Sequence, residues 1–426
     1  MSMSNSRKVA LNIAVTWVVQ ALNLFTPLIT FPWLSRCLGL EGFGNYLFVL
    51  SVTAYCVLLS DYGFNVSSTR EISISRDNLS LRSKIFFETM GCKLFLITLS
   101  FIILIALTCQ IEKLALLRNE LFVAFFYVLG VSLTPSWYFF GIEKIVLFSV
   151  INTVLKAIFV PITVLLVKNP NDVIVALWIY ATTSISICIL CNSYLFFKKE
   201  IVLHKIGLSF IQKRLKNDFQ LFVSFLAVGF YTSLNPALLG VVTSVQQVAI
   251  YAGTEKMIKT IESIMAMPAT VLFSRVSHLS SHNRPTGIKL VNRIVLYFTV
   301  MSAVLMLIIF IYGDRLLAII YGSEFVGATE TVRIVSVIPL LGALSIAFGN
   351  LGLLNFGGKK AFTNILLCGS VLNVILMTFL GGKFGSSGAA MSLVLTTSFI
   401  CISMGIAWKI LSSNTLCQKS ISEELI

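Results

Sequence analysis

The residues best placed to do chemistry are charged side chains inside long apolar stretches of the sequence. Lys156 lies about midway along the apolar stretch 145–167, too deep to reach either membrane interface comfortably. Lys93 lies about a third of the way into another stretch, where its long side chain either extends to the interface or faces a polar interior. A charge at the bilayer centre costs about 2.5–3.5 kcal/mol, so such lysines are candidate functional residues. Asp61 and Arg70 are predicted as interfacial anchors, a structural pair or an ion-coupling pair.

The apolar stretch 249–273 carries a group of four charges, Glu255, Lys256, Lys259 and Glu262. Glu255 precedes Lys259 by four residues, and Glu262 follows Lys259 by three, so these side chains share one helical face. Two interpretations remain open. The charges pair with one another and merely permit insertion, or Lys259 binds substrate while the two acids serve ion coupling.

A polar stripe along the first apolar stretch, 10–34, indicates a surface that is not lipid-facing. Its members recur at spacings close to three and four, as on one face of a helix: Asn12, Thr16, Gln20, Asn23 and Thr30. Such side chains either hydrogen-bond a neighbouring helix or line a water-filled cavity. We predict a cavity, with Gln20 and Asn23 among its substrate-binding residues.

The elements that must position these residues are membrane-spanning helices. The 426-residue chain is 57% hydrophobic and 12% charged, whereas a soluble domain carries about 25% charged residues. About 20 helical residues cross the hydrocarbon core of a bilayer. About twelve apolar stretches approach that length: 10–34, 44–66, 86–109, 119–140, 145–167, 173–197, 219–242, 249–273, 294–312, 332–354, 361–380 and 386–408. The sequence therefore predicts an all-α integral membrane protein with no soluble catalytic domain.

The formal net charge of +14 would suggest nucleic-acid binding in a soluble protein, so the placement of the charges has to decide. With a cytoplasmic N-terminus, the cytoplasmic segments carry 21 of the 32 Lys and Arg, and the opposite face carries seven. This bias is the positive-inside pattern. We therefore predict that both termini are cytoplasmic and that nucleic acid is not a partner.

The longest gap between apolar stretches, 198–218, divides them six and six. It carries six basic residues around a short apolar run and is predicted to lie at the cytoplasmic interface. We predict an N-terminal six-helix bundle at 1–197, a basic linker at 198–218 and a C-terminal six-helix bundle at 219–426. A tyrosine follows the first hairpin of each half, at Tyr46 and at Tyr251. This is one of several weak similarities between the halves that favour internal duplication.

No pattern for a metal, cofactor or nucleotide is present in the sequence. His278 and His282 have the spacing of a metal pair, but they lie in a polar segment without a nearby Cys or acid. The nine cysteines are scattered mainly through apolar stretches, where free Cys packs as a small hydrophobe. We therefore expect no metal, no cofactor and no enzymatic activity.

Four strings of the sequence carry a family resemblance. They are PWLSRCLGLEGFGNY at 32–46, DYGFNVSSTREI at 61–72, PSWYFFGIEK at 135–144 and VAIYAGTEKM at 248–257. Together these strings resemble the Wzx-type polysaccharide repeat-unit flippases, members of the superfamily that also contains drug/cation antiporters. The first half of the chain matches this family well, and the second half matches more loosely.

The resemblance implies a V-shaped pair of six-helix bundles, as in MATE transporters, working by alternating access in the bacterial inner membrane. The implied substrate is undecaprenyl-diphosphate carrying one O-antigen or capsule repeat unit, with Lys156 and Lys259 at the diphosphate. A polar, cationic cavity open sideways to lipid suits this anionic head and long apolar tail. The resemblance also suggests membrane lipids, the polymerase and the chain-length regulator of the same pathway as partners.

Three other functions are alternatives to a repeat-unit flippase. A drug/cation antiporter of the same fold would favour acids in its cavity, whereas most deep charges here are lysines. A peptidoglycan-precursor flippase usually has more spans. A membrane polysaccharide polymerase would need acids on sizeable outward loops, which are short here. The driving force, either a coupling ion or the membrane potential, stays open.

Overall fold

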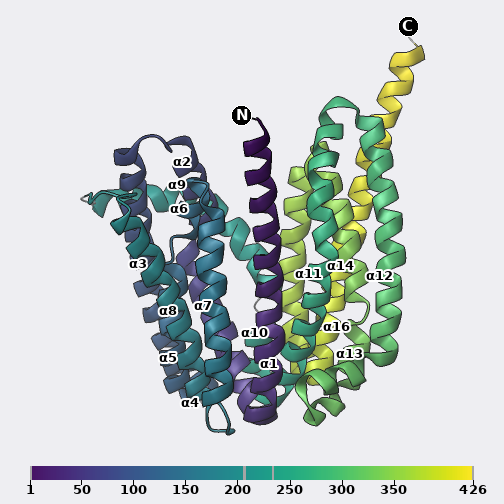
Figure 1. The fold of residues 1–426 in the computed structure, drawn as a ribbon. Helices are drawn as coiled ribbons and strands as arrows, with labels where there is room; N and C mark the ends of the chain where they lie inside the picture. The colour runs from purple at the N-terminus through teal and green to yellow at the C-terminus, as the bar shows by residue number, and fades with distance from the viewer. Residues whose placement is uncertain (1, 205–207, 233–234, 425–426) are drawn as a thin grey trace. The chain divides into compact units, whose positions relative to one another are not determined.

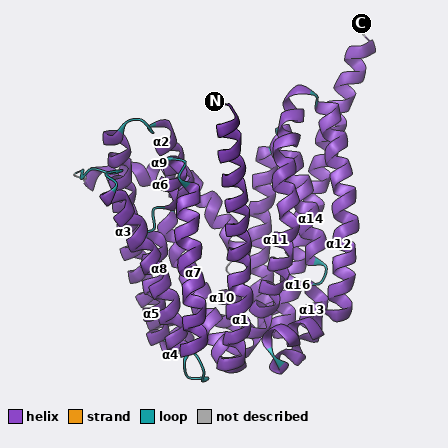
Figure 2. Ribbon diagram, in the orientation of Figure 1, coloured by secondary structure: helices purple, strands orange, loops and turns teal. Residues whose placement is uncertain are grey.

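The chain folds almost entirely into helices joined by short connections (Figure 1). The computed structural model describes residues 2–204, 208–232 and 235–424, and no strand occurs in these ranges (Figure 2). Contacts divide the chain into two compact units, Met1–Gly229 and Phe230–Ile426. Each unit has its own buried apolar core.

The first unit contains long helices that carry the apolar stretches and short helices at their ends. In its described residues they are α1 (Ser2–Asp61), α2 (Phe64–Ile74), α3 (Leu79–Gln110), α4 (Glu112–Leu116), α5 (Arg118–Ser132), α6 (Ser136–Gly141), α7 (Ile145–Leu166), α8 (Val173–Phe197) and α9 (Leu208–Thr232). Helix α1 consists of two arms, because Gly39 has a φ of 66°, in the left-handed region that favours glycine. The indole Nε1 of Trp33 donates to the carbonyl of Val167 at 3.0 Å and so joins α1 to the end of α7.

The core of the first unit depends on one close helix approach and one aromatic cluster. A Cβ at Gly130 of α5 would lie 2.6 Å from the backbone nitrogen of Ile185 in α8, so only glycine fits there. Trp137, Tyr138 and Phe139 of α6 are fully buried. They hold the short helix α6 against α2, α3 and α8, which places the polar residues around it.

The second unit follows the same plan with more interruptions. Its described elements are α10 (Asn235–Val242), α11 (Val245–His282), α12 (Arg284–Tyr321), η1 (Ser323–Ala328), α13 (Thr329–Val335), α14 (Ile338–Ser345), the π-helix η2 (Ile346–Leu353), α15 (Leu354–Phe356) and α16 (Lys359–Glu424). Helix α16 again consists of two arms, which meet at Gly385 with a φ of 60°. In the core, Trp408 packs on Gly352 and donates from its Nε1 to Asn292 at 3.0 Å.

The number of membrane passages follows from the lengths and kinks of these helices. Eight segments of the described residues are long and apolar enough to cross a membrane. Two of them, Ile29–Ile74 and Lys359–Ser413, are longer than one crossing of about 20 residues needs, and each contains a glycine kink. Counting both arms of these two segments, and adding α9 with α10 and α11, gives twelve passages in the described part of the chain. The predicted all-α integral membrane fold with about twelve helices is confirmed.

The segment predicted as the basic linker begins where α8 ends, at Phe197. Part of 198–218 belongs to α9, and the boundary between the compact units falls after Gly229. The division at 197 and 219 stays a prediction.

Candidate functional site

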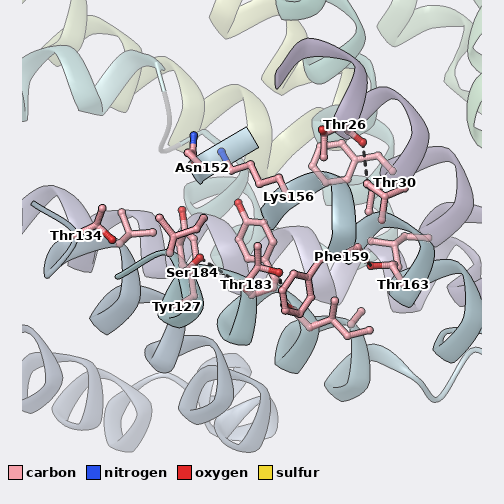
Figure 3. Close-up of a pocket in the computed structure, with 18 of the residues that line it drawn as sticks. Thr26, Thr30, Tyr127, Thr134, Asn152, Lys156, Phe159, Thr163, Thr183 and Ser184 are labelled. Carbon is pink, nitrogen blue, oxygen red and sulfur yellow. Dashed lines mark hydrogen bonds between the residues drawn. The ribbon is translucent and has the colours of Figure 1, made fainter. Parts of the chain in front are cut away.

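A cavity of about 360 Å³ lies inside the first unit, where α1, α7 and α8 face the ends of α5 and α6 (Figure 3). Helix α7 contributes one face to it, with lining residues at positions 148, 152, 156, 159 and 163. This spacing keeps returning to the same side of a helix. All of the described lining residues belong to the first unit.

Lys156 is the charged side chain among the lining residues that the structure describes. Asn152 precedes it by one turn on the same wall, as Figure 3 shows. In the described parts of the chain no carboxylate lies within ion-pair distance of the Lys156 Nζ. An ammonium group without a counter-charge at this depth is costly, so an anionic ligand would offset the cost of burying it.

Threonine and serine hydroxyls on the other walls are oriented in a common way. Their hydroxyl protons are donated to carbonyls of their own helices, at distances of 2.7–3.2 Å: Thr30, Thr134, Thr163, Thr183 and Ser184. A hydroxyl that has donated its proton still accepts through its lone pairs. The cavity therefore combines one cation with several hydrogen-bond acceptors, a combination that suits an anionic group attached to a polyol.

Aromatic side chains form part of the cavity wall. The rings of Tyr127 and Tyr180 stack with their centroids 4.6 Å apart, and Tyr46 lies fully buried beside the cavity. Stacked aromatic rings of this kind hold a shape at low entropic cost. The cavity wall thus combines aromatic side chains with one cationic side chain and several hydroxyl groups.

Helix α7 is the most loosely packed wall of the cavity. Only Thr153 and Thr163 are buried among its described residues, and its outer face exposes apolar side chains such as Val154 and Ile158. Pro161 lies inside this helix and removes one backbone hydrogen bond a little more than a turn after Lys156. Helix α7 thus has an apolar outer face suited to lipid and an inner face that carries Asn152, Lys156 and Thr163. It also lacks one backbone hydrogen bond close to the lysine.

The charges predicted in the second unit lie on α11 and are arranged differently. The Lys259 Nζ lies 2.8 Å from Glu255 Oε1, and Glu255 is only 4% exposed. Glu262 packs directly on α14 at Gly342, where a Cβ would overlap its carboxylate. The predicted Glu255–Lys259 pair is therefore present, whereas Glu262 contacts helix backbone.

The remaining predicted residues fall into three situations. Lys93 is 2% exposed and its Nζ contacts Asp61 Oδ1 at 3.0 Å, so the structure brings together two residues that had been assigned different roles. Arg70 is exposed on α2 and does not pair with Asp61. The side chains of Gln20 and Asn23 lie outside the described residues, but Thr30 of the same stripe lines the cavity.

Sequence reasoning missed most of the cavity wall. Asn152, Tyr127, Tyr180 and Thr183 were not predicted as site residues, although all four line the cavity. For Asn152 a signal was present, because it precedes Lys156 by four residues and must share its helical face. For the tyrosines and Thr183 the contact depends on how α5, α7 and α8 pack, which no local spacing reveals.

A helical membrane fold with a cavity that a lysine and several hydroxyl groups line is typical of a membrane transporter. The chain belongs to the family described as Polysaccharide biosynthesis protein, whose profile matches residues 9–280. This result confirms the family resemblance predicted from the four sequence strings.

Individual proteins support the same assignment. A protein of Escherichia coli strain K12 named "Putative O-antigen transporter" is 24% identical over 401 residues, covering 93% of this chain and 96% of that protein. A multidrug resistance MATE family transporter of the MOP superfamily, in an inward-facing conformation, is similar in fold, with a TM-score of 0.72 at 13% identity over 92% of this chain and 95% of that one. The lipid II flippase MurJ gives a TM-score of 0.68 at 12% identity, covering 96% of this chain and 91% of its own.

Proposed function

We propose that this protein is a flippase for undecaprenyl-diphosphate-linked O-antigen or capsular repeat units. It would move them from the cytoplasmic to the periplasmic leaflet of the bacterial inner membrane by alternating access. The family, the O-antigen transporter relative and the fold shared with a lipid II flippase support this substrate class. The positive-inside distribution of Lys and Arg supports cytoplasmic termini.

The observation that carries the proposal is Lys156, for which the described residues supply no carboxylate partner, in a cavity whose wall carries hydroxyl acceptors. A diphosphate supplies the anion that Lys156 lacks, and sugar hydroxyls supply donors for the threonine and serine oxygens. A neutral drug would use neither feature. The cavity volume of about 360 Å³ accommodates only part of a repeat unit, so the rest of the glycan would lie outside it.

The other predicted residues take supporting roles in this proposal. Lys259 is a second contact for the diphosphate, weakened by its pairing with Glu255. Gln20 and Asn23 extend the polar stripe that reaches the cavity at Thr30. The buried contact of Lys93 with Asp61 favours a structural role over substrate binding for this lysine.

The membrane potential favours export of such a substrate. Moving an anion out of a negative cytoplasm releases about 2.3 kcal/mol per charge for each 100 mV of potential. Glu255 and Glu262 are the acids in the second unit at which ion coupling would add to this drive. The polymerase and the chain-length regulator of the pathway are the partners that would receive the exported unit.

A drug/cation antiporter of the same fold is the second candidate, since a MATE transporter shares this fold. Such a protein needs a carboxylate where it holds a cationic drug. In the described lining of the first unit's cavity the charged residue is instead a lysine. This lysine carries the charge opposite to the one that a cationic drug requires, so it favours the flippase over the antiporter.

Complementation separates the two candidates. The chain is expressed in a strain that lacks its native flippase but makes the matching repeat unit, and surface O-antigen or capsule is measured per amount of membrane protein. The flippase proposal predicts restored display by the wild-type chain and at least about a tenfold loss with Lys156→Ala, since 1.4 kcal/mol corresponds to one factor of ten. Resistance to cationic drugs without restored display would favour the antiporter.

A further inference from the structure

Three charged side chains of the first unit meet outside the Lys156 cavity, beside the turn between α6 and α7. This turn lies at the end of the unit opposite α4 (Figure 1). The carboxylate of Glu200 bridges two cations: its Oε1 lies 2.5 Å from the Nζ of Lys144, and its Oε2 lies 2.9 Å from Nη2 of Arg82. The side chains of Glu200 and Arg82 are 17% and 15% exposed. Glu200 therefore joins α3, which carries Arg82, to the turn that precedes α7.

Lys144 and Glu200 occupy equivalent positions in two turns of the same kind. After α6, the backbone nitrogen of Lys144 donates to the carbonyl of Phe139 at 2.8 Å. After α8, the backbone nitrogen of Glu200 donates to the carbonyl of Leu195 at 2.9 Å. Each hydrogen bond spans five residues and closes a Schellman motif, a common cap at the C-terminus of a helix. Both members of the ion pair thus follow directly after a capped helix end.

The residue before each member of the pair adopts a backbone conformation that favours glycine. Glu143 has a φ of 58° and Lys199 a φ of 52°, both in the left-handed region. Other residues keep this conformation only where the surrounding structure holds them, and such positions are concentrated at functional sites. The chain therefore keeps two strained turns, each of which places one member of the Lys144–Glu200 pair.

The string PSWYFFGIEK contributes a second contact to Glu200. The hydroxyl of Tyr138, a fully buried residue of this string, donates to the backbone carbonyl of Glu200 at 2.6 Å. Lys144 is the last residue of the same string, and its Nζ also lies 5.6 Å from the ring centroid of Tyr194 on α8. Two residues of one string thus hold Glu200, one at its carboxylate and one at its carbonyl.

These contacts fix the start of α7, the helix that carries Lys156. Lys144 is the N-cap of α7. One turn further on, the ring of Phe148 packs on the ring of Phe140, with centroids 5.7 Å apart. Phe148 also lines the Lys156 cavity. The contacts of Glu200 therefore reach the cavity wall through a single turn of helix.

The packing of α7 is loose over the rest of its length. Among its described residues only Thr153 and Thr163 are buried. At the far end of the helix, the carbonyl of Val167 accepts the hydrogen bond from Trp33. Polar contacts thus hold both ends of α7, and the position of Lys156 between them depends on these contacts.

We propose that Glu200 is a positioning residue for Lys156: its carboxylate holds the start of α7 through Lys144 and so sets the position of Lys156 in the cavity. Glu200 is not among the described lining residues, so it acts through the helix. A binding group is effective when its support holds it within about 0.5 Å of the productive position. The contact of Lys156 with a diphosphate rests on the function proposed above, whereas the attachment of α7 does not.

Amide hydrogen exchange of the purified full-length protein tests the attachment without any ligand. Two variants break the link. Lys144→Gln leaves Glu200 paired with Arg82, and Glu200→Gln removes the carboxylate from both cations. In each variant, exchange over the first half of α7, 145–155, should rise at least about fivefold. Exchange in α5 should stay as in the wild type.

Glu143→Gln is the matched control for these variants. It makes the same chemical change in the same turn, but Glu143 pairs with Arg76 at the surface and its side chain is 73% exposed. Surface ion pairs contribute little to stability. Exchange over α7 in Glu143→Gln should therefore equal that of the wild type.

Binding of undecaprenyl diphosphate in lipid nanodiscs shows whether the attachment acts through Lys156. The Kd is compared among wild type, Lys144→Gln, Lys156→Ala and the double variant. Lys144→Gln alone should raise the Kd about fivefold. Added to Lys156→Ala it should raise the Kd less than about twofold, because the side chain that it displaces is absent. A merely structural role for Lys144 would give the same factor in both backgrounds.

The outcomes separate this inference from the proposed function. Unchanged exchange over α7 in Lys144→Gln, or an equal factor in Kd with and without Lys156, would overturn the inference. If Glu200→Gln does not fold, Lys144→Gln decides, because it keeps the buried contact of Glu200 with Arg82. A wild type that does not bind undecaprenyl diphosphate, together with raised exchange over α7 in Lys144→Gln alone of the two turn variants, would contradict the flippase function and support the positioning of α7 by Glu200.

Discussion

Each unit of the molecule carries a partly exposed lysine within a long helix, but the surroundings of the two charges differ. In the first unit Lys156 lines a cavity, and no carboxylate is among the lining residues that the structure describes. In the second, Lys259 pairs with the buried Glu255 at 2.8 Å. Depth in the membrane shows that a charge is costly, whereas the partner shows whether that charge is available to a ligand. The available charge is the one in the first unit.

Helix α7 is also packed more loosely than the helices at the close contacts of either unit. Helix α7, which carries Lys156, buries few of its side chains and contains Pro161. In the second unit, η2 packs so closely on its neighbours that a Cβ at Gly349 would lie 2.7 Å from the sulfur of Met404. Loose packing leaves room for a ligand and for movement, and close packing supports a rigid frame.

Charge reversal at Lys156 should give the largest effect and so test the comparison most severely. Lys156→Glu places an anion against the diphosphate, and at an effective dielectric constant of 20 each contact at 4 Å is worth about 4 kcal/mol. We expect glycan display, normalised to membrane protein, to fall at least about 100-fold, while Lys156→Arg retains part of it. Full display by Lys156→Glu at normal abundance would make Lys156 a structural residue.

The buried pair in the first unit should affect stability rather than transport. Lys93→Ala leaves Asp61 without its counter-charge, which should lower the free energy of unfolding by about 1–3 kcal/mol, less than a fully buried pair because Asp61 is partly exposed. Protein abundance and Tm should fall, and display per protein should stay near wild type. The double variant Lys93→Ala with Asp61→Ala should recover part of the stability. Loss of display per protein without loss of Tm would instead assign Lys93 to the substrate.

Lys259 should matter less than Lys156, because Glu255 already neutralises it. We expect Lys259→Ala to lower display by about tenfold or less, as for a contact worth at most about 1.4 kcal/mol. Glu255→Gln, which removes the counter-charge and keeps the side-chain volume, should make Lys259 more available and should not weaken the binding of undecaprenyl diphosphate, whatever its effect on ion coupling. A greater loss with Lys259→Ala than with Lys156→Ala would reverse the comparison between the units.

The smallest expected effect concerns a single acceptor of the cavity. Thr183→Val keeps the side-chain shape but removes the oxygen that faces the cavity, and a hydrogen bond is worth about 1 kcal/mol. Transport should fall about fivefold. Thr98→Val is the matched control, since Thr98 on α3 is exposed and also donates only to its own helix. Equal losses in both variants would mean that the effect lies in helix stability.

The sequence was sufficient to predict those features of the fold and the site that depend on local patterns of residues. Apolar stretches of spanning length predicted the helices, and the i, i+4 spacing predicted the Glu255–Lys259 pair that the structure contains. Depth alone singled out Lys156. It also singled out Lys93, and there the prediction of substrate contact lacks support, because its partner Asp61 lies 32 residues away in sequence. The tyrosines and threonines that line the cavity depend on contacts between distant helices, which spacing along one helix does not encode.

The central claim is that Lys156 holds the diphosphate, and direct binding tests it without the steps of transport. Purified wild-type protein, Lys156→Ala and Lys259→Ala are titrated with undecaprenyl diphosphate in lipid nanodiscs, with undecaprenol as the uncharged control. We predict that Lys156→Ala raises the Kd at least about tenfold, that Lys259→Ala raises it less, and that undecaprenol does not distinguish the three proteins. An unchanged Kd in Lys156→Ala, with the protein folded, would contradict the account.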